Sequence, residues 1–386
     1  MKIVHVCLCG SYNDYWGYQD NMIPKYNILD GHEVTVITST FINSKNSEGY
    51  EKVSPRDYYL KTGEKIIRIP FFVNNFLFEK LRIYRGLERK LENENPDIIF
   101  IHSMQFVDLY KVINYKKNNP NVKIVIDSHA TYDNSAKNFL SKYILHKILW
   151  KKIINKYVDY FEKIYMIAPA CKKFAIEMYS LPDRKIEYLY LGADTERIDF
   201  DKKGLINKTI RTDLGISETD LVFVTGGKLS KGKNISNLMK VFKHLKNPDI
   251  KLIIFGKFSQ DENEKMLKEV NNDKRIIHIG WIEGESVYDY YLASDVAIFP
   301  GTKSALWEQA ICSGLPIIAR KWEGMEYVDV GGNCLFLENG SVKEIKMAIE
   351  KIYSDKKLRE SMSKIAMTMG YEIFSYEKIS KQAIDV

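Results

Sequence analysis

Short apolar runs, each about the length of one strand, alternate along this chain with longer segments whose apolar residues recur at helical spacing. The first half contains KIVHVCLC, HEVTVITS, KIIRIPFF, DIIFIHS, KIVID and KIYMIA, and the second half contains LVFVTGG, IKLIIFG, RIIHIG, DVAIFP and LPIIA. Continuous apolar runs that are each followed by a helix are typical of parallel sheets covered on both faces. The pattern therefore predicts an α/β chain.

The alternation is interrupted once, by polar and charged residues between positions 195 and 219. We therefore predict two doubly wound, Rossmann-like domains, over 1–200 and 220–370, joined by a linker over 201–219. Helices are expected in the first domain near 17–29, 79–93, 106–118 and 134–160. They are expected in the second near 234–245, 261–270, 285–293, 304–313, 341–353 and 356–369.

Composition indicates the environment in which the chain works, but it says little about the chemistry that the chain performs. No apolar run approaches the roughly 18–20 residues of a spanning helix, and no cleavage site follows the apolar start MKIVHVCLCG. The five cysteines are scattered and form no zinc pattern, so we expect a cytoplasmic protein without a metal site. The net charge of +7 fits nucleic acid, anionic lipid or a phosphorylated small molecule, and does not decide among them.

The segment TGGKLSKGKN, at 225–234, follows a predicted buried strand and opens a helix. Gly226 and Gly227 allow a sharp turn, and Lys228, Lys231 and Lys233 then crowd the start of the helix, where anions are already favoured. Positive charges this close repel one another unless a bound anion neutralises them, and a diphosphate is the natural partner. A solvated basic turn is the alternative.

A second candidate site lies in FPGTKSALWEQAICSGLPII, at 299–318. The loop amides of Gly301, Thr302 and Lys303 can face phosphate oxygens, and Ser304 is placed to cap the helix that follows. Glu308 lies about one turn into that helix among apolar neighbours, which argues against a solvated role. Its carboxylate can accept hydrogen bonds from a vicinal diol such as that of ribose.

At these motifs the chain resembles the donor-binding half of GT-B glycosyltransferases, and most of all the retaining glycosyltransferase family 4. The resemblance rests on the order of GKLSKGKNISNLM, IKLIIFG, RIIHIGWIEGESVYDYYLASDVAIFP and WEQAICSGLPIIA. The segments DGHEVTVITS, PDIIFIHS and LGAD fit the acceptor half, and FSYEKISKQAI resembles a last helix, within 371–386, that crosses back to the N-terminal domain. The implied fold is two Rossmann-like domains that face each other across a cleft.

The resemblance assigns roles to several residues. Lys228 and Lys233 match the pair that holds the donor diphosphate and acts in catalysis, together with the turn at Gly227. Gly280, Trp281 and Ile282 match the loop that contacts the nucleobase, and Glu308 matches the second Glu of the E-x7-E motif, which holds the ribose. The first Glu of that motif is missing, because Pro300 stands in its place. Its role cannot be assigned to one residue of the loop Gly301-Thr302-Lys303-Ser304.

Two segments of the first domain complete the expected site. His129, in KIVIDSHATYDN, matches a histidine that the family places against the donor sugar, whereas His102 has no such context. In CGSYNDYWGYQDN, Gly10 and Gly17 bracket a loop that in the family faces the diphosphate and the acceptor. Tyr15, Trp16 and Gln19 are candidates to line an acceptor pocket, with an ordinary surface loop as the alternative.

The segment 137–163 is rich in lysine and carries Leu, Ile, Trp and Tyr at helical spacing. Such a helix can lie on an anionic membrane surface through 137–156, or it can be a core-facing helix with a solvated basic face.

We expect glycosyl transfer from a nucleotide sugar, UDP-linked rather than GDP-linked, to a hydroxyl of a bacterial surface glycan or lipid-linked glycan, with retention and without a metal or other cofactor. A non-catalytic GT-B module that binds a partner or glycan, and a sugar-nucleotide epimerase of GT-B fold, are the alternatives. A nucleic-acid partner is not expected, because the lysines gather at strand ends rather than along one recognition element.

Overall fold

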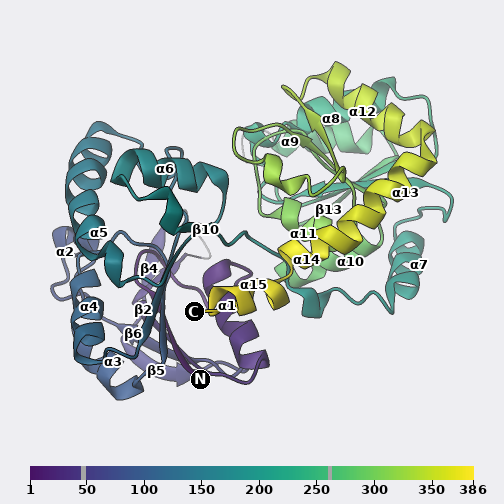
Figure 1. The fold of residues 1–386 in the computed structure, drawn as a ribbon. Helices are drawn as coiled ribbons and strands as arrows, with labels where there is room; N and C mark the ends of the chain where they lie inside the picture. The colour runs from purple at the N-terminus through teal and green to yellow at the C-terminus, as the bar shows by residue number, and fades with distance from the viewer. Residues whose placement is uncertain (45–48, 260–262) are drawn as a thin grey trace. The chain divides into compact units, whose positions relative to one another are not determined.

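The computed structural model describes residues 1–44, 49–259 and 263–386. It divides into two compact units (Figure 1): unit 1 contains Met1–Tyr190 with Ile379–Val386, and unit 2 contains Leu191–Lys378. Within these described ranges, no helix is long and apolar enough to cross a bilayer.

Unit 1 is built on an eight-stranded sheet with the order β10-β9-β8-β7-β1-β2-β6-β5. All neighbouring strands are parallel except the edge pair of β5 and β6. The central strands are apolar on both faces because helices cover both (Figure 1), with α3, α4 and α5 on one face and α1 and α15 on the other. The strands are β1 (Lys2–Cys7), β2 (Glu33–Ser39), β5 (Arg56–Tyr59), β6 (Lys65–Ile69), β7 (Ile98–Ile101), β8 (Lys123–Ser128), β9 (Lys163–Met166) and β10 (Ile186–Tyr188).

The helices of unit 1 follow the strands in the expected order. They are α1 (Gln19–Leu29), α2 (Phe76–Leu81), α3 (Leu87–Glu94), α4 (Leu109–Asn118), a π-helix (Leu140–Trp150), α5 (Lys151–Tyr157) and α6 (Pro169–Tyr179). The helix α15 (Tyr376–Ala383) ends in unit 1, where Tyr165 donates a hydrogen bond to the carbonyl of Gln382 at 2.7 Å.

Unit 2 has a six-stranded, fully parallel sheet with the order β13-β12-β11-β14-β15-β16. Helices α8, α9 and α12 lie on one face, and α10 and α11 lie on the other (Figure 1). The strands are β11 (Leu221–Gly226), β12 (Ile250–Phe255), β13 (Ile276–Gly280), β14 (Val296–Phe299), β15 (Ile317–Arg320) and β16 (Cys334–Leu337). The helices are α7 (Lys203–Asp213), α8 (Ile235–His244), α9 (Asn263–Asn271), α10 (Val287–Leu292), α11 (Leu306–Cys312), α12 (Val342–Ser354), α13 (Lys356–Ile365) and α14 (Tyr371–Phe374).

Several elements differ from the sequence prediction. The helix expected near 79–93 is two helices, because Arg82 and Gly86 adopt left-handed backbone conformations between them. The range 201–219, expected as a linker, contains α7, which donates from the buried Arg211 to the carboxylate of Asp295 in unit 2. The short strands β3 (Phe41–Asn43) and β4 (Tyr50–Lys52), together with β5 and β16, were not predicted. Positions 261 and 262 of the helix expected near 261–270 lie outside the described residues.

Candidate functional site

The loops predicted to bind a donor all leave the carboxyl edge of the sheet in unit 2. They follow β11, β13 and β14, and β11 lies directly beside β14 in the sheet. The carboxyl edge of an open parallel sheet is where α/β proteins bind their ligands. The structure therefore places the predicted donor residues of this unit along one edge.

The turn after β11 is shaped by contact between backbones. Gly227 has a φ of +104°, which residues with a side chain rarely adopt. A Cβ on Gly256, which follows β12, would lie 1.9 Å from the carbonyl oxygen of Gly227. No side chain fits between these two turns, so the chain leaves both strands with its backbone groups close to the edge of the sheet.

The three lysines of the loop after β11 have different surroundings. Lys228 and Lys231 are exposed, whereas Lys233 is half-buried. Lys233 Nζ donates to the carbonyl oxygens of Thr302 and Lys303, at 3.2 Å each, and burial lowers its pKa to about 8. Lys233 therefore ties the loop after β11 to the loop after β14 while remaining mostly charged at neutral pH.

Gly301 is the point at which these two loops touch. A Cβ at this position would lie 2.2 Å from the carbonyl oxygen of Gly232 and 2.3 Å from the carbonyl carbon of Lys233. The amide of Thr302 donates to that same Gly232 oxygen at 2.9 Å, and the indole of Trp322 donates to the Gly301 carbonyl at 3.0 Å. The two loops thus form one hydrogen-bonded structure.

Ser304 does not cap the following helix as predicted. The cap position of α11 is Ala305, no side chain caps it, and Ser304 Oγ lies 3.5 Å from the amide of Leu306.

Glu308, in the first turn of α11, is 1% exposed. Its Oε1 accepts a hydrogen bond from Tyr327 at 2.5 Å, and its Oε2 has no partner among the residues that the structure describes. Burial raises the pKa of Glu308 to about 7, although the bond from Tyr327 lowers it. A buried carboxylate with one unbonded oxygen has unused capacity to accept a hydrogen bond from a ligand hydroxyl or from water. Tyr327 was missed from the sequence, since nothing in it links positions 19 residues apart.

The loop after β13 presents backbone and one large side chain. Gly280 has a φ of +75°, and its carbonyl accepts from the Gly256 amide at 2.6 Å. Trp281 is 60% exposed, and Ile282 is partly buried. The predicted base loop therefore starts at β13, which β12 separates from β11 and the turn at Gly227, and it offers an apolar surface.

The loop after β1 only partly fits the predicted acceptor pocket. Tyr15 and Trp16 are exposed, but Gln19 is fully buried at the start of α1, so it does not line an open surface. Neither side-chain polar atom of Gln19 has a partner among the described residues. Gly10 and Gly17 have no atom within 4 Å of a built Cβ and no positive φ, so packing does not require glycine at either position.

His129 lies just past β8, with its side chain 34% exposed. Its Nε2 is 3.3 Å from Oδ2 of the fully buried Asp127, which also accepts from the Ser103 amide at 2.9 Å. Burial lowers the pKa of His129, but the charge and hydrogen bond of Asp127 outweigh burial, and the net shift is upward. Asp127 was missed as a site residue, although a carboxylate at the end of the buried run KIVID was a usable signal.

The segment 137–163 has both buried and exposed apolar residues. Trp150 and Ile154 are buried in unit 1 and therefore do not face outward. The exposed apolar side chains form what we call the 139–148 patch, which contains Phe139, Leu140, Tyr143, Ile144 and Ile148.

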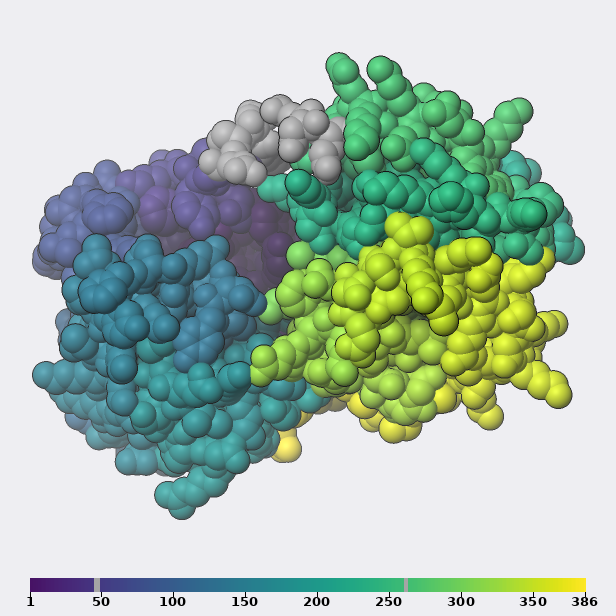
Figure 2. Space-filling model, turned by 90° about the horizontal axis from the view of Figure 1, so that it is seen from above, coloured from purple at the N-terminus to yellow at the C-terminus, as the bar shows by residue number. Residues whose placement is uncertain are grey.

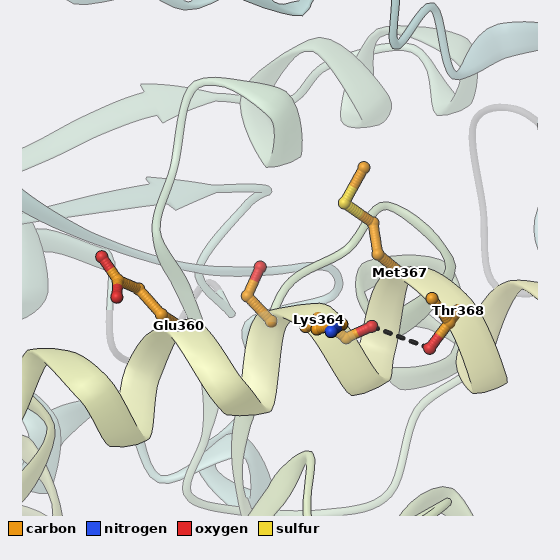
Figure 3. Close-up of a pocket in the computed structure, with 5 residues that line it drawn as sticks. Glu360, Lys364, Met367 and Thr368 are labelled. Atoms are coloured by element: carbon orange, nitrogen blue, oxygen red, sulfur yellow. Dashed lines mark hydrogen bonds between the residues drawn. The ribbon is translucent and has the colours of Figure 1, made fainter.

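A shallow pocket lies elsewhere, on α13 and the π-helical turn after it, Ala366–Gly370 (Figure 3). Its lining consists of Glu360, Ser363, Lys364, Met367 and Thr368, and includes none of the predicted site residues. This part of unit 2 belongs to the yellow surface in Figure 2. Throughout residues 1–44, 49–259 and 263–386, no three His, Cys, Asp or Glu side chains are arranged to hold a metal ion.

Two family profiles match successive parts of the chain. The profile described as Glycosyltransferase Family 4 matches residues 29–197, and the profile described as Glycosyl transferases group 1 matches residues 206–369. Together they cover the candidate residues of unit 2 and His129 in unit 1, whereas the candidate residues of the loop after β1 lie outside both matches.

Two curated relatives and a solved structure are similar to the chain. An uncharacterized glycosyltransferase of Methanocaldococcus jannaschii is 30% identical over 262 residues, which are 65% of this chain and 63% of that protein. The N-acetylgalactosamine-N,N'-diacetylbacillosaminyl-diphospho-undecaprenol 4-alpha-N-acetylgalactosaminyltransferase of Campylobacter jejuni is 25% identical over 248 residues, 61% and 64% of the two chains. The matches thus span less than two thirds of the length of either relative.

The solved structure is that of the Anabaena protein HepE in complex with UDP. It is 14% identical to this chain and has a TM-score of 0.66, covering 99% of this chain and 98% of HepE. At this identity the likeness concerns the fold, and the predicted GT-B fold is confirmed.

Proposed function

We propose that this chain, which belongs to the group 1 glycosyltransferases of the family 4 type, transfers a sugar from a nucleotide-sugar donor to a hydroxyl group of an acceptor. The nucleotide would bind at the carboxyl edge of the sheet in unit 2. There the loops after β11, β13 and β14 would hold the diphosphate, the base and the ribose.

The observation that carries this proposal is the surroundings of Glu308. The carboxylate is buried, uses one oxygen to accept from Tyr327 and leaves the other oxygen unbonded within the described residues. Leaving a buried acceptor unpaired costs about 1–3 kcal/mol, so such a group is expected to meet a ligand or water. A ribose hydroxyl would supply the missing donor.

Positive charge for the diphosphate would come from Lys228 and Lys233. Charge develops on the departing diphosphate, and fixed donors placed around it stabilise the transition state. We propose that these lysines and the loop amides provide this stabilisation without a metal ion. Transfer that stops when EDTA is added would contradict that part of the proposal.

The donor and acceptor classes are proposed from the relatives. UDP is the nucleotide in the HepE structure, which favours a UDP-sugar over a GDP-sugar. The name of the Campylobacter jejuni relative describes a sugar linked to undecaprenol through a diphosphate. We therefore propose a lipid-linked or surface glycan as the acceptor. Retention at the anomeric carbon is proposed from the family resemblance.

The test is a panel of nucleotides, beginning with thermal shifts for UDP, GDP and ADP at equal concentration. UDP should stabilise the chain most, and UDP-sugars should then release UDP faster when a diphospholipid-linked glycan is added. Proton NMR of the product would report the anomeric configuration. Stabilisation by none of the three nucleotides would contradict the proposed donor site.

A non-catalytic GT-B module is the second candidate, because Pro300 replaces the first Glu of E-x7-E. Such a module would bind UDP and yet neither hydrolyse nor transfer any UDP-sugar in the panel. UDP binding combined with an absence of turnover across all sugars and acceptors would favour this alternative.

A further inference from the structure

Unit 1 contains a line of polar side chains that crosses three neighbouring strands. Asn27 Oδ1 lies 3.0 Å from His5 Nε2, and His5 Nδ1 lies 3.0 Å from His102 Nε2. His102 Nδ1 lies 3.1 Å from Asp127 Oδ2, which lies 3.3 Å from His129 Nε2. The strands β1, β7 and β8 are adjacent in the sheet, and this adjacency brings together residues as far as 97 positions apart in the sequence. His102, which had no supporting context in the sequence, is a central member.

The line has a single exit to solvent among its members. Asn27, His5 and Asp127 are 0% exposed and His102 is 5% exposed, whereas the side chain of His129 is 34% exposed. Burying polar groups costs free energy that an apolar core would not incur, unless each group is paired. Packing alone does not require such a line to end at the carboxyl end of β8, where the site residue His129 lies.

The negative charge of this line lies on Asp127, next to the partly exposed His129. Burial raises the pKa of Asp127, but the charges and hydrogen bonds of His129 and His102 outweigh burial and hold that pKa well below its usual range. At the other end, burial and the neighbouring His102 lower the pKa of His5, which keeps it neutral. Asp127 is therefore an anion fixed by two imidazoles and the Ser103 amide.

This anion determines which nitrogen of His129 faces outward. Nε2 faces a carboxylate, so it carries a proton, and Nδ1, on the other side of the ring, has no partner among the described residues. The charged and titratable groups around His129 are Asp127 on β8 and Asp20 on α1, and both favour the protonated ring. Around Asp127 they are His5, His102, His129 and Asp20, with the thiols of Cys7 and Cys9 on and after β1.

We propose that Asp127 is a positioning residue that fixes the imidazole of His129 through Nε2 and favours its doubly protonated form, in which Nδ1 is a hydrogen-bond donor. The buried pair His5 and His102 holds Asp127 in turn. The proposal rests on the proposed function in one respect: the group that Nδ1 would meet is a sugar oxygen of a substrate of the proposed transfer. The family resemblance points to His129 alone, and the support from Asp127, His102 and His5 comes from this structure.

The first experiment needs no substrate, so its outcome is independent of the proposed function. Long-range ¹H–¹⁵N NMR of the full chain follows the titration and tautomer of each histidine. In the wild type, His129 should titrate above its ordinary value, with Nε2 protonated in the neutral form. In Asp127→Asn its pKa should fall by about 1–3 units, which is the range for losing an opposite charge at this distance.

A matched control separates this effect from the loss of any buried carboxylate. Asp108 is also 0% exposed in unit 1, but it accepts from the Tyr84 amide and from Lys111 rather than from a histidine. Asp108→Asn should leave the titration of His129 unchanged. His102→Gln, which loosens Asp127 without removing it, should give a smaller downward shift and serves if Asp127→Asn does not fold. Unchanged titration of His129 in a folded Asp127→Asn protein would overturn the proposal.

The second experiment uses the reaction. With a UDP-sugar, Asp127→Asn should lower kcat by up to about tenfold, as far as His129→Ala does, leave the donor KM within about twofold, and move the alkaline limb of the pH profile downward. Asp127→Glu keeps the charge and should restore part of kcat. Loss through KM alone, or equal kcat in Asp127→Asn and wild type, would contradict the positioning role even if transfer itself is confirmed.

Discussion

Unit 1 and unit 2 end their central strands in different ways. In unit 1, side chains of β1, β7 and β8 meet below the surface, with Asp127 bonded to His102 and His129. In unit 2, the turns that follow β11, β12 and β14 contact one another through backbone atoms, and glycine occupies positions 227, 256 and 301 in these turns. The first arrangement depends on pairing buried polar side chains with one another, although Nδ2 of Asn27 has no partner among the described residues, and the second depends on side chains being absent.

The difference indicates a division of labour. A rigid edge of backbone groups and a buried acceptor, as in unit 2, suits the binding of an unreacted nucleotide. A fixed imidazole, as in unit 1, suits a step in which charge changes. Substitutions in unit 2 should therefore change nucleotide affinity, and substitutions in unit 1 should change turnover.

The largest effect is expected from Gly301→Ala. The added methyl group would meet the backbone at Gly232 and Lys233, and neither loop can yield without breaking the Thr302 bond. The free energy of unfolding should fall by about 1–3 kcal/mol, as for other overpacked sites, and UDP affinity should fall more than it does in Glu308→Ala. Gly284→Ala is the control, since no atom lies within 4 Å of its Cβ. If the contact were unimportant, Gly301→Ala and Gly284→Ala would have the same stability in urea unfolding and the same UDP affinity in calorimetry.

The second-largest loss of UDP affinity is expected from Glu308→Ala. Loss of a charged hydrogen bond to ribose costs about 1.5–3 kcal/mol, so affinity for UDP should fall at least tenfold. Glu308→Gln keeps the shape and the bond from Tyr327 and should lose less. UDP binding by Glu308→Ala at wild-type strength would exclude the ribose role.

The raised pKa of Glu308 adds a pH dependence to the same site. The folded carboxyl titrates near 7 and the unfolded one near 4.5, so its contribution to stability is complete below 4.5 and is lost as the pH rises to 7. Uridine affinity should rise across pH 7, because the carboxylate is the better acceptor and uridine has no phosphate to titrate. Glu308→Gln should flatten both curves. A wild-type uridine affinity that falls through pH 7 would contradict this reading.

His129→Ala tests the other side of the comparison. If unit 1 acts on the reacting sugar, kcat should fall about tenfold, the scale of one charge-assisted hydrogen bond, while UDP affinity stays within about twofold. Steady-state kinetics with calorimetry would separate the two quantities. Equal turnover in mutant and wild type would assign His129 to the structure of unit 1 alone.

Substitutions of the three lysines in the loop after β11 should change UDP affinity by smaller factors. Lys228→Ala should weaken UDP several-fold and uridine hardly at all, because the lost contact is to phosphate. Lys233→Ala should weaken both ligands, since it also releases the carbonyls of Thr302 and Lys303. Lys231→Ala is the matched control, as an exposed lysine of the same loop. Equal effects of all three would indicate a general charge effect.

The two units also differ in how much of each candidate site the local sequence predicts. Gly226, Gly227 and the three lysines stand together at 226–233, at the end of β11 and in the loop after it, so local sequence predicted the turn there, and the role of the lysines stays a prediction. The line from His5 to His129 depends on which strands are neighbours, and local sequence does not contain that information. Tyr327 was missed for the same reason, and Gln19 was expected at the surface because a polar residue beside a loop usually lies there. The break in the helix near 82–86 came from backbone conformation that the apolar spacing does not reveal.

A last difference concerns the surfaces of the units. The 139–148 patch of unit 1 exposes Phe139 by 71% and Leu140 by 64%, and Lys147 and Lys152 are exposed on and beside it. Exposed apolar side chains among lysines are typical of helices that lie on anionic membranes. An ordinary solvated face would carry fewer exposed apolar residues, so we expect reversible docking of unit 1 on anionic lipid.

The smallest effect expected is that of one lysine beside this patch. Each lysine near an anionic surface adds about 1 kcal/mol, so Lys152→Ala should weaken binding to vesicles of phosphatidylglycerol and phosphatidylcholine about fivefold. Lys357→Ala, an exposed lysine of α13 in unit 2, should leave it unchanged. Added salt should weaken wild-type binding, because screening acts over about 8 Å at physiological ionic strength. Sedimentation that shows no wild-type binding at low salt, or equal loss in both variants, would assign the lysines to a solvated face and favour an acceptor that is not held in a membrane.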